Sequence, residues 1–527
     1  MRDTDTTSLL DALPARLSDI VRAGAARAPH DPALHDGQRH WSYAELARAV
    51  DDTAALLRKL KVRGGDRVMV VAENCVAQVV LTFACAAVDA WVVHVNGRLS
   101  AREVDLIRDH SGARRVFYTA SCSPEAAAHG RRHRARVADT AFGQWMIGEL
   151  NARCLPEPVQ ADGAAQAAAL LYTTGTTGQP KGVMLSHRSL LFIAAVSSRL
   201  RGLQPGDRAW GVLPISHVYG LASVMLGTLH AGACLYLCPR FQPALLLQAL
   251  ERDRLTILQG VPGMYARLLE TLATPGQRLA TQLRFIYAGG SPLTPSLKAD
   301  VEQLFGLPLH NGYGLTESSP TVSQTRLDQP RTDTSVGMVI PGVEARIVDA
   351  DGADVATGTP GELWVRGPNV MLGYYREPGL SAAAMRDGGW LNTGDIARRE
   401  ADGALFIAGR TKELIIRSGF NVYPLEVETV LNAHPGVTQS AVVGRNAADG
   451  NEEVVAYVEL DPRRDVALDE LHHHLAGALA PYKRPAEIIA MAALPAAASG
   501  KILKNQLRQM AQGAAPHKTE HNKHGRE

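Results

Sequence analysis

The sequence predicts an α/β protein, with a large N-terminal domain of parallel-rich sheets covered by helices plus a β-rich subdomain, followed by a small mobile α+β C-terminal domain. Three observations predict this fold class. The chain has 527 residues, which is too many for one hydrophobic core at roughly 100–200 residues per domain. Short β-branched runs alternate with longer helical patterns through most of the chain. Two later changes of texture then mark the subdomain and the small domain.

The alternation of strands and helices begins with the run RVMVVA at 67–72, which reads as a strand, and continues with a helical stretch and a strand at 91–95. The same pairing recurs as AALLYT before a helix from His187, ACLYLC before one from Pro243, LTILQG before one from Pro262, and RFIYAGG before one from Thr294. Strands that are separated by helices run parallel, and both faces of their sheet are covered.

Two later segments have a different texture. From about position 336, glycines and prolines separate the short strands VEARIVD, GELWVRG and ALFIAGR, which is typical of a small β-rich subdomain. After position 409, the strands ELIIRS, TQSAVVGR and EEVVAYVEL alternate with helices from Pro424 and near Leu468, which indicates an α+β unit. We therefore predict domains at 1–411 and 412–510, and a polar, disordered tail at 511–527.

Composition and charge exclude several classes of function. With 55 basic and 53 acidic side chains the net charge is +2, so no broad basic field is available to bind nucleic acid or an anionic membrane. Six cysteines in so long a chain do not indicate a disulfide framework. Cys234 and Cys238, in ACLYLC, could be a metal pair, but they read as residues of a buried strand because no second ligand pair accompanies them.

The stretch 76–95 has the length of a membrane span, but Gln78 and Asp89 interrupt it, and an aspartate at mid-span is costly. We expect a buried helix that runs into a strand, and no transmembrane segment. The N-terminus lacks the basic start and the apolar run of a signal peptide. A cytoplasmic location is the expectation.

The sharpest local signal is LLYTTGTTGQPKGVMLSH at 170–187, in which an apolar strand runs into a loop rich in threonine and glycine. Glycines let backbone N–H groups turn toward a ligand, hydroxyls donate hydrogen bonds, and a lysine adds positive charge, which together suit a polyphosphate. It is not a Walker A loop, and a flexible surface loop is the alternative. The predicted phosphate-binding residues are Thr173, Thr174, Gly175, Thr176, Thr177, Gly178 and Lys181.

Further motifs accompany this loop: LPISHVYGL (213–221), AGGSP (288–292), NGYGLTE (311–317), GELWVRG (361–367), WLNTGD (390–395), GRTKELIIRSGFNVYP (409–424) and SGKI (499–502). Together they resemble, in the same order, the motifs of the adenylate-forming superfamily, which includes acyl-CoA synthetases, luciferases and peptide-synthetase adenylation domains. The resemblance extends from about Ser42 to Arg508. It implies an enzyme that activates a carboxylic acid with ATP.

The chemistry explains why such residues are needed. A carboxylate is a poor electrophile, whereas attack on the α-phosphate of ATP gives an acyl-adenylate from which AMP leaves easily. The protein must therefore bring two anions together and stabilise a crowded phosphorus centre. Lys501 matches the family lysine that bridges the acid and the α-phosphate. Two departures surround it: LPAAASGK lacks the basic or hydroxyl residues often found before this lysine, and Lys504 stands where arginine is common.

Most other matches imply contacts with the nucleotide. Glu317 would bind Mg²⁺ through a hard carboxylate oxygen, Thr316 would hydrogen-bond the α-phosphate, and Tyr313 would stack on adenine. Asp395 would hold both ribose hydroxyls, and Arg410 would reach the ribose and phosphate region. The resemblance also assigns to the ATP site Gly289, Gly290, Ser291, Asn311, Gly312 and Gly314.

Three residues are implied to serve the acid, the thiol and the domain motion. His217, in ISHVYG, would lie beside the acyl pocket and, with Lys501 and Thr316, complete the catalytic set; its alternative is a polar loop residue. Lys412 matches the hinge about which the C-terminal domain rotates between half-reactions. Gly419 matches the glycine that lines the tunnel for the pantetheine of CoA.

The leading expectation is a free-standing acid–CoA ligase that uses ATP, Mg²⁺ and coenzyme A and acts on a fatty or aromatic acid, because the pocket segments are mostly small or apolar. A homo-oligomer is possible. An acyl-AMP ligase that loads a carrier protein, a luciferase-like oxygenase and an inactive nucleotide-binding relic stay open. A malonyl-type dicarboxylate–CoA ligase is suggested by Arg267, although this residue reads as a helix-surface arginine.

Overall fold

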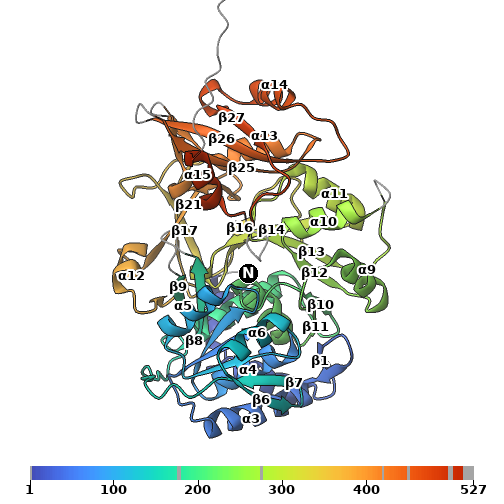
Figure 1. The fold of residues 1–527 in the computed structure, drawn as a ribbon, viewed down its shortest axis with the longest axis vertical. Helices are drawn as coiled ribbons and strands as arrows, with labels where there is room; N and C mark the ends of the chain where they lie inside the picture. Colours follow the sequence, from blue (N-terminus) through green and yellow to red (C-terminus); the bar gives the residue numbers. More distant parts are fainter. Residues whose placement is uncertain are drawn as a thin grey trace, which may run out of the picture. The chain divides into compact units, whose positions relative to one another are not determined.

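The computed structural model describes residues 3–174, 180–272, 277–417, 420–447, 451–496 and 502–513. The chain forms two compact units, Met1–Ile407 and Ala408–Glu527. This division falls inside a strand, a few residues before the boundary at 411/412 that the sequence predicts. Figure 1 follows the elements of both units by colour along the chain.

The first unit contains a nine-stranded sheet, sheet A, which carries most of the predicted site motifs. Its strands in spatial order are β16 (Met338–Val339), β15 (Thr321–Gln324), β14 (Leu309–Gly314), β13 (Phe285–Gly289), β12 (Ile257–Gly260), β10 (Arg208–Gly211), β11 (Cys234–Leu237), β1 (Pro32–His35) and β2 (His40–Ser42). The six strands from β14 to β1 run parallel, and antiparallel strands pair at both edges.

A second sheet of the same unit, sheet B, has eight strands. In spatial order they are β19 (Gly373–Tyr374), β9 (Pro180–Ser186), β8 (Ala167–Thr174), β4 (Trp91–Asn96), β3 (Arg67–Ala72), β5 (Arg115–Tyr118), β7 (Gly143–Ile147) and β6 (Arg136–Thr140). The strands β8, β4, β3 and β5 run parallel, and the flanking strands are antiparallel. The parallel-rich sheets predicted from the sequence are confirmed.

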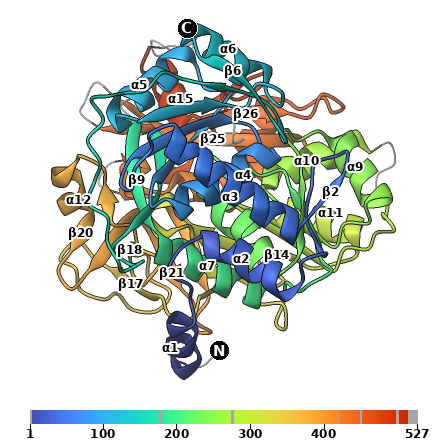
Figure 2. The same cartoon turned by 90° about the horizontal axis from the view of Figure 1, so that it is seen from below.

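Helices fill the space between the two sheets. This layer consists of α2 (Ser18–Arg27), α3 (Tyr43–Lys59), α4 (Val76–Ala87), α7 (His187–Leu200), the π-helix η1 (Tyr219–Leu226) and α8 (Gly227–His230). Successive strand residues point to opposite faces, so Val68 and Val70 of β3 belong to this central core, whereas Met69 and Val71 face the other side. Figure 2 shows α2, α3 and α4 packed side by side.

The outer faces of both sheets are also covered. Sheet A packs against α9 (Pro243–Arg252), α10 (Pro262–Thr271) and α11 (Pro295–Phe305). Sheet B packs against α5 (Ala101–Ser111) and α6 (Pro124–Arg132). Parallel sheets need this double cover because their strands are apolar on both faces.

A smaller β-rich part completes the first unit, as the sequence predicts. Its strands are β17 (Glu344–Val348), β18 (Gly361–Arg366), β21 (Trp390–Arg399) and β20 (Met385–Arg386), and β22 (Leu405–Arg410) pairs with β21. The short elements α1 (Asp3–Asp11), η2 (Thr316–Ser318) and α12 (Pro378–Ala384) lie in the connecting segments.

The second unit is the predicted α+β fold. It begins with η3 (Thr411–Glu413) and the hairpin β23 (Ile415–Arg417) and β24 (Phe420–Val422). A sheet of β25 (Val437–Asn446), β26 (Glu452–Leu460) and β27 (Glu487–Ala490) packs on one face against α13 (Pro424–Asn432) and α14 (Leu468–Ala478), and on the other against α15 (Lys504–Gly513). The turn η4 (Pro481–Lys483) precedes β27.

Two local predictions need correction. The sequence predicts a loop between β8 and a helix from about His187; the helix is confirmed, but the strand β9 precedes it and pairs antiparallel with β8, so the Thr/Gly loop joins a hairpin. The predicted disordered tail starts at 511, but α15 continues to Gly513, because Ala511 is buried one helical turn after Leu507 in the same core. The rest of the predicted tail lies outside the described residues.

The buried helix and the strand expected at 76–95 are confirmed. Residues 76–95 form the buried helix α4 and most of the strand β4. Among the described residues, no helix is both long and apolar enough to cross a membrane. Cys234 and Cys238 are free and buried at β11.

Candidate active site

Several predicted site residues lie at one edge of sheet A. The parallel strands β10, β12, β13 and β14 end there, and the motifs with His217, Gly289 and Gly314 lie at or directly after their carboxyl ends. Gly289 pairs directly with Gly312 across β13 and β14. In open α/β sheets, ligands bind outside the carboxyl ends of the strands. The topology therefore gathers these motifs at the edge where a ligand is expected.

Two glycines of β14 permit a close approach that any side chain would block. A Cβ atom on Gly312 would lie 1.7 Å from the hydroxyl of Tyr287, and one on Gly314 would lie 1.9 Å from the carbonyl oxygen of Pro320. Asn311 beside them is buried, and its amide donates to the carbonyls of Thr334 at 3.2 Å and Ser335 at 3.1 Å. The side chain of Asn311 therefore fixes a neighbouring loop.

Tyr313 and Asp395 meet although they are distant in sequence. The Tyr313 hydroxyl donates a 2.5 Å hydrogen bond to Oδ2 of Asp395, which is 2% exposed. The turn before Asp395 is held because the Thr393 hydroxyl donates to the carbonyl of Leu363 at 2.7 Å and accepts from the backbone N–H of Asp395 at 3.1 Å. The aromatic ring and the carboxylate assigned to adenine and ribose are thus adjacent.

Tyr374, which the sequence analysis missed, links two other predicted residues. Its hydroxyl donates to Oε1 of Glu317 at 2.9 Å, and Nζ of Lys181 lies 5.4 Å from its ring centroid. Burial, together with the negative charge of Glu317, raises the pKa of Tyr374 above its ordinary value. Tyr374 therefore stays a neutral donor, and it holds the carboxylate assigned to Mg²⁺ next to the phosphate-loop lysine. No local motif marks this tyrosine.

The Thr/Gly loop connects the two strands of the hairpin, β8 and β9. Thr173 pairs with Lys181, and the backbone of Thr174 pairs with Pro180. On its other edge β9 pairs with β19, where Tyr374 stands opposite Val183, so the hairpin is fixed from both sides. The loop residues Gly175, Thr176, Thr177 and Gly178 lie outside the described residues, and their predicted contact with phosphate stays a prediction.

The remaining nucleotide residues of the first unit are placed by short elements. Thr316 and Glu317 form the turn η2 after β14, and Thr316 is buried. Gly290 and Ser291 follow β13, and Gly290 has a φ of +82°, which favours glycine. In the part of the chain that the structure describes, no group of three or more His, Cys, Asp or Glu could hold a metal ion. The binding of Mg²⁺ at Glu317 stays a prediction.

His217 is exposed in the turn between β10 and η1, and its backbone N–H donates to the carbonyl of Pro214 at 2.9 Å. The segment before it is held by a buried side chain that the sequence analysis missed. The Asn74 amide donates to the carbonyls of Gly211 and Leu213, and its oxygen accepts from the N–H of Ile215, each at 2.9 Å. Asn74 therefore positions the backbone that leads to His217.

Asn74→Ala is expected to lower the free energy of unfolding of the first unit by about 2–4 kcal/mol, because three buried backbone groups lose their partner. Urea unfolding followed by circular dichroism measures this change. Asn74→Asp keeps the acceptor for Ile215 but turns a buried carboxylate oxygen toward the carbonyls of Gly211 and Leu213, so it should lose at least as much. An unchanged unfolding free energy in Asn74→Ala would show that water or a local shift replaces the three hydrogen bonds.

The second unit contains the predicted hinge. Lys412 is exposed in η3, and Arg410 ends the strand before it. Lys504 ties this segment to the domain core, because its Nζ lies 3.1 Å from Oε2 of Glu413 and 2.7 Å from Oε1 of Glu428. Burial alone would lower the pKa of Lys504, but the charges of Glu428 and Glu413 hold it above its usual value. The roles predicted for Gly419 and Lys501 fall on positions outside the described residues.

Lys504→Met is expected to lower the free energy of unfolding of the second unit by about 3 kcal/mol, because two carboxylates lose a largely buried cation. Thermal unfolding monitored by calorimetry measures the loss. Lys504→Arg is the matched control and should stay close to the parent protein, since it keeps the charge. Equal losses in both variants would mean that side-chain shape matters here and charge does not.

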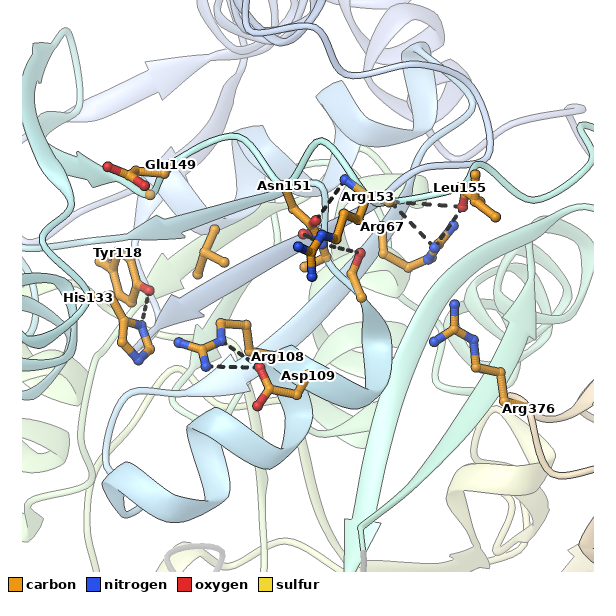
Figure 3. A pocket seen from close by; sticks show the side chains of 15 residues that line it. Arg67, Arg108, Asp109, Tyr118, His133, Glu149, Asn151, Arg153, Leu155 and Arg376 are labelled. Carbon is orange, nitrogen blue, oxygen red and sulfur yellow. Dashed lines mark hydrogen bonds and ion pairs between the residues drawn. The ribbon is translucent and has the colours of Figure 1, made fainter.

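The described part of the chain also contains a pocket of about 570 Å³, and none of the predicted site residues lines it (Figure 3). Two of its arginines bind carbonyl groups at the end of α5: Arg67 donates to Ser111 at 3.1 Å, and Arg376 donates to His110 at 3.1 Å. Cations are favourable at a helix C-terminus, where carbonyl groups point outward. We therefore attribute these arginines to stabilisation of α5.

The chain folds into two sheets covered by helices and a separate α+β unit. Its candidate site combines an aromatic–carboxylate pair with a lysine beside a Thr/Gly hairpin. Together, this fold and this site define a nucleotide-using class of protein. The chain belongs to the AMP-binding enzyme family. The family model described as AMP-binding enzyme matches residues 21–375, and the model described as AMP-binding enzyme C-terminal domain matches residues 426–501.

Relatives and solved structures agree with this membership. The chain is 35% identical over 493 residues to a feruloyl-CoA synthase of Amycolatopsis sp, which covers 92% of this chain and 97% of that protein. It is 33% identical over 528 residues to 4-coumarate–CoA ligase 2 of Oryza sativa subsp. japonica, covering 93% and 92%. The structure of ATP-bound MatB from Rhodopseudomonas palustris is 30% identical and matches with a TM-score of 0.81 over 97% of this chain and 99% of MatB. The chain is an adenylate-forming enzyme of the acyl-CoA synthetase type.

Proposed function

We propose that this enzyme is an ATP-dependent, AMP-forming ligase that joins an aromatic carboxylic acid to coenzyme A. The observation that carries the proposal is the pairing of Tyr313 with Asp395, beside the contact chain Lys181, Tyr374 and Glu317. A nucleoside triphosphate needs an aromatic face, an acceptor for its ribose hydroxyls, a cation and a metal-binding carboxylate. The names feruloyl-CoA synthase and 4-coumarate–CoA ligase of two relatives support an aromatic acid.

In the first half-reaction, an oxygen of the acid attacks the α-phosphorus, forms the acyl–phosphate bond and displaces pyrophosphate. Lys181 supplies positive charge at the base of the phosphate hairpin, and Lys501 bridges the acid and the α-phosphate. A carboxylate has about four acceptor positions, so Asp395 can accept from two ribose hydroxyls while it keeps the Tyr313 hydrogen bond. Mg²⁺ bound at Glu317 would neutralise phosphate charge.

In the second half-reaction, the thiol of CoA attacks the acyl carbon, the thioester bond forms, and AMP leaves with the former carboxyl oxygen. The exposed position of His217 at the end of β10 suits a group that meets the incoming thiol. The glycine at 419 would leave room for the pantetheine, and rotation about Lys412 would exchange the two active arrangements.

The test uses the purified full chain with ATP, Mg²⁺ and a panel of aryl, straight-chain and dicarboxylic acids, each with CoA or with a phosphopantetheinylated carrier protein. Pyrophosphate release and thioester formation are followed separately. Aryl acids should give the highest kcat/KM, and CoA should be the acceptor. Thioester formation on the carrier alone would replace CoA as the proposed acceptor, and a preference for straight-chain acids would overturn the aromatic assignment.

A further inference from the structure

A buried arginine lies close to the carboxyl edge of sheet A and has no carboxylate partner among the described residues. Arg201, at the C-cap of α7, is 1% exposed. Its NH1 donates to Oε1 of Gln259 on β12 at 2.7 Å, and its guanidinium carbon lies 4.3 Å from the ring centroid of Tyr287 on β13. Both partners are neutral. A buried cation is usually paired with an anion, because its desolvation is costly.

Three hydrogen-bond donors in this cluster are also unpartnered. Nε of Arg201, Nε2 of Gln259 and the hydroxyl of Tyr219 are buried, and none has a hydrogen-bond partner among the described residues. The three donors come from the end of α7, from β12 and from η1. Leaving a buried donor without a hydrogen bond destabilises the protein, because the donor has lost its water and gained no partner. Several such donors around one cation indicate a site for an acceptor oxygen.

The cluster lies next to the motif residues of the candidate active site. A Cβ atom on Gly289 would lie 3.3 Å from the ring of Tyr287 and 3.4 Å from the ring of Tyr219, and the two ring centroids are 6.2 Å apart. Tyr219 follows His217 by two residues in the sequence, and Gln259 is the penultimate residue of β12. The donors are therefore grouped behind the strand ends where the acid is proposed to bind.

We propose that Arg201, Gln259 and Tyr219 form a subsite that recognises an oxygen acceptor at the far end of the acid, in the first place the ring hydroxyl of an aryl acid. This inference rests on the proposed function, since it assumes that the acid enters at this edge of sheet A. The three donors need an acceptor oxygen, and the aromatic acid of the proposed function supplies one as its ring hydroxyl. An acid without such an oxygen leaves the donors unpaired and is selected against.

The same chemistry could come from a ring hydroxyl or from a second carboxylate, and the test separates these two sources. The purified full chain is given 3-phenylpropenoic acid, its 4-hydroxy derivative or a dicarboxylic acid of similar length, and kcat/KM for pyrophosphate release is measured. The 4-hydroxy acid should exceed the unsubstituted acid by about 10-fold or more. A larger preference for the dicarboxylic acid would overturn the ring hydroxyl as the group recognised.

Two variants test the subsite itself. Gln259→Glu is nearly isosteric and gives Arg201 a carboxylate partner, and Arg201→Met removes the charge at similar length. Both should bring the ratio of kcat/KM for the two aryl acids close to one while the unsubstituted acid keeps its value within about threefold. Arg199→Met, an exposed position of the same helix, is the matched control and should keep the parent ratio.

The outcomes are distinguishable. If Gln259→Glu raises the melting temperature but keeps the parent ratio, Arg201 serves only packing and the proposed subsite is wrong. An equal loss of activity toward both aryl acids in both variants would also contradict the proposed subsite. A subsite that recognises the ring hydroxyl must, when it is changed, affect the hydroxylated acid most. Failure of every acid to release pyrophosphate in the parent protein would instead overturn the proposed function.

Discussion

Lys501→Ala should abolish acyl-adenylate formation and leave the conversion of supplied acyl-adenylate to thioester largely intact. Removing one charge-stabilising donor from an acyl- or phosphoryl-transfer site costs at least roughly 3–4 kcal/mol of transition-state stabilisation, which is a loss of about 100-fold or more. The effect should be selective because Lys501 is assigned to the α-phosphate, which no longer reacts once the acyl-adenylate exists. Its place rests on the ordered motifs of the sequence.

The two half-reactions are measured separately, the first by pyrophosphate release and the second by thioester formation from synthetic acyl-adenylate and CoA. Lys412→Pro should have the opposite effect, because a proline at the hinge restricts the backbone rotation that the second half-reaction requires. It should retain adenylation and lose thioester formation. If both variants fail in both assays, or survive in both, two alternating arrangements do not operate in this enzyme.

Glu317→Gln should reduce adenylation by about 100-fold and weaken its dependence on Mg²⁺, since a neutral amide is a poor substitute for the hard carboxylate oxygen that this cation prefers. The side chain keeps its size, and its amide oxygen can still accept from the Tyr374 hydroxyl, so folding should be preserved. A titration of pyrophosphate release against MgCl₂ measures the effect.

Tyr374→Phe is the control for this experiment. It removes only the 2.9 Å hydrogen bond to Glu317 and keeps the ring below Lys181, so the loss should be about tenfold or less. Equal losses in Tyr374→Phe and Glu317→Gln would indicate that the carboxylate acts through its hydrogen bond. An unchanged Mg²⁺ dependence in Glu317→Gln would exclude this residue as the metal ligand.

Much of the fold could be predicted because hydrophobic period and strand–helix alternation are local signals. The β3 run at 67–72 and the helices after Pro243 and Pro262 appear as the sequence predicts. The strand β9 was missed, because KGVMLS follows a loop motif and its pairing with β8 depends on the hairpin. The end of α15 was misplaced, because the burial of Ala511 is a tertiary contact that no polar tail composition reveals.

The ordered motifs predicted the residues of the candidate site, but the contacts between these residues could not be predicted from the sequence. Nothing local in the sequence indicates that Tyr313 and Asp395 share a hydrogen bond, since β14 and β21 belong to different sheets. Tyr374 and Asn74 belong to no motif. Each of them holds a residue or segment that belongs to one. The partners of Arg201 likewise come from other strands of sheet A. Such residues become visible only when long-range packing is known.

Acid-dependent exchange of radiolabelled pyrophosphate into ATP, in the absence of CoA, tests most directly whether this enzyme forms an acyl-adenylate. The reaction is reversible before the thiol arrives, so label should enter ATP when an aryl acid is present and remain in pyrophosphate when it is absent. Exchange that is independent of any acid, or cleavage of ATP to ADP and phosphate, would contradict adenylate formation at this site.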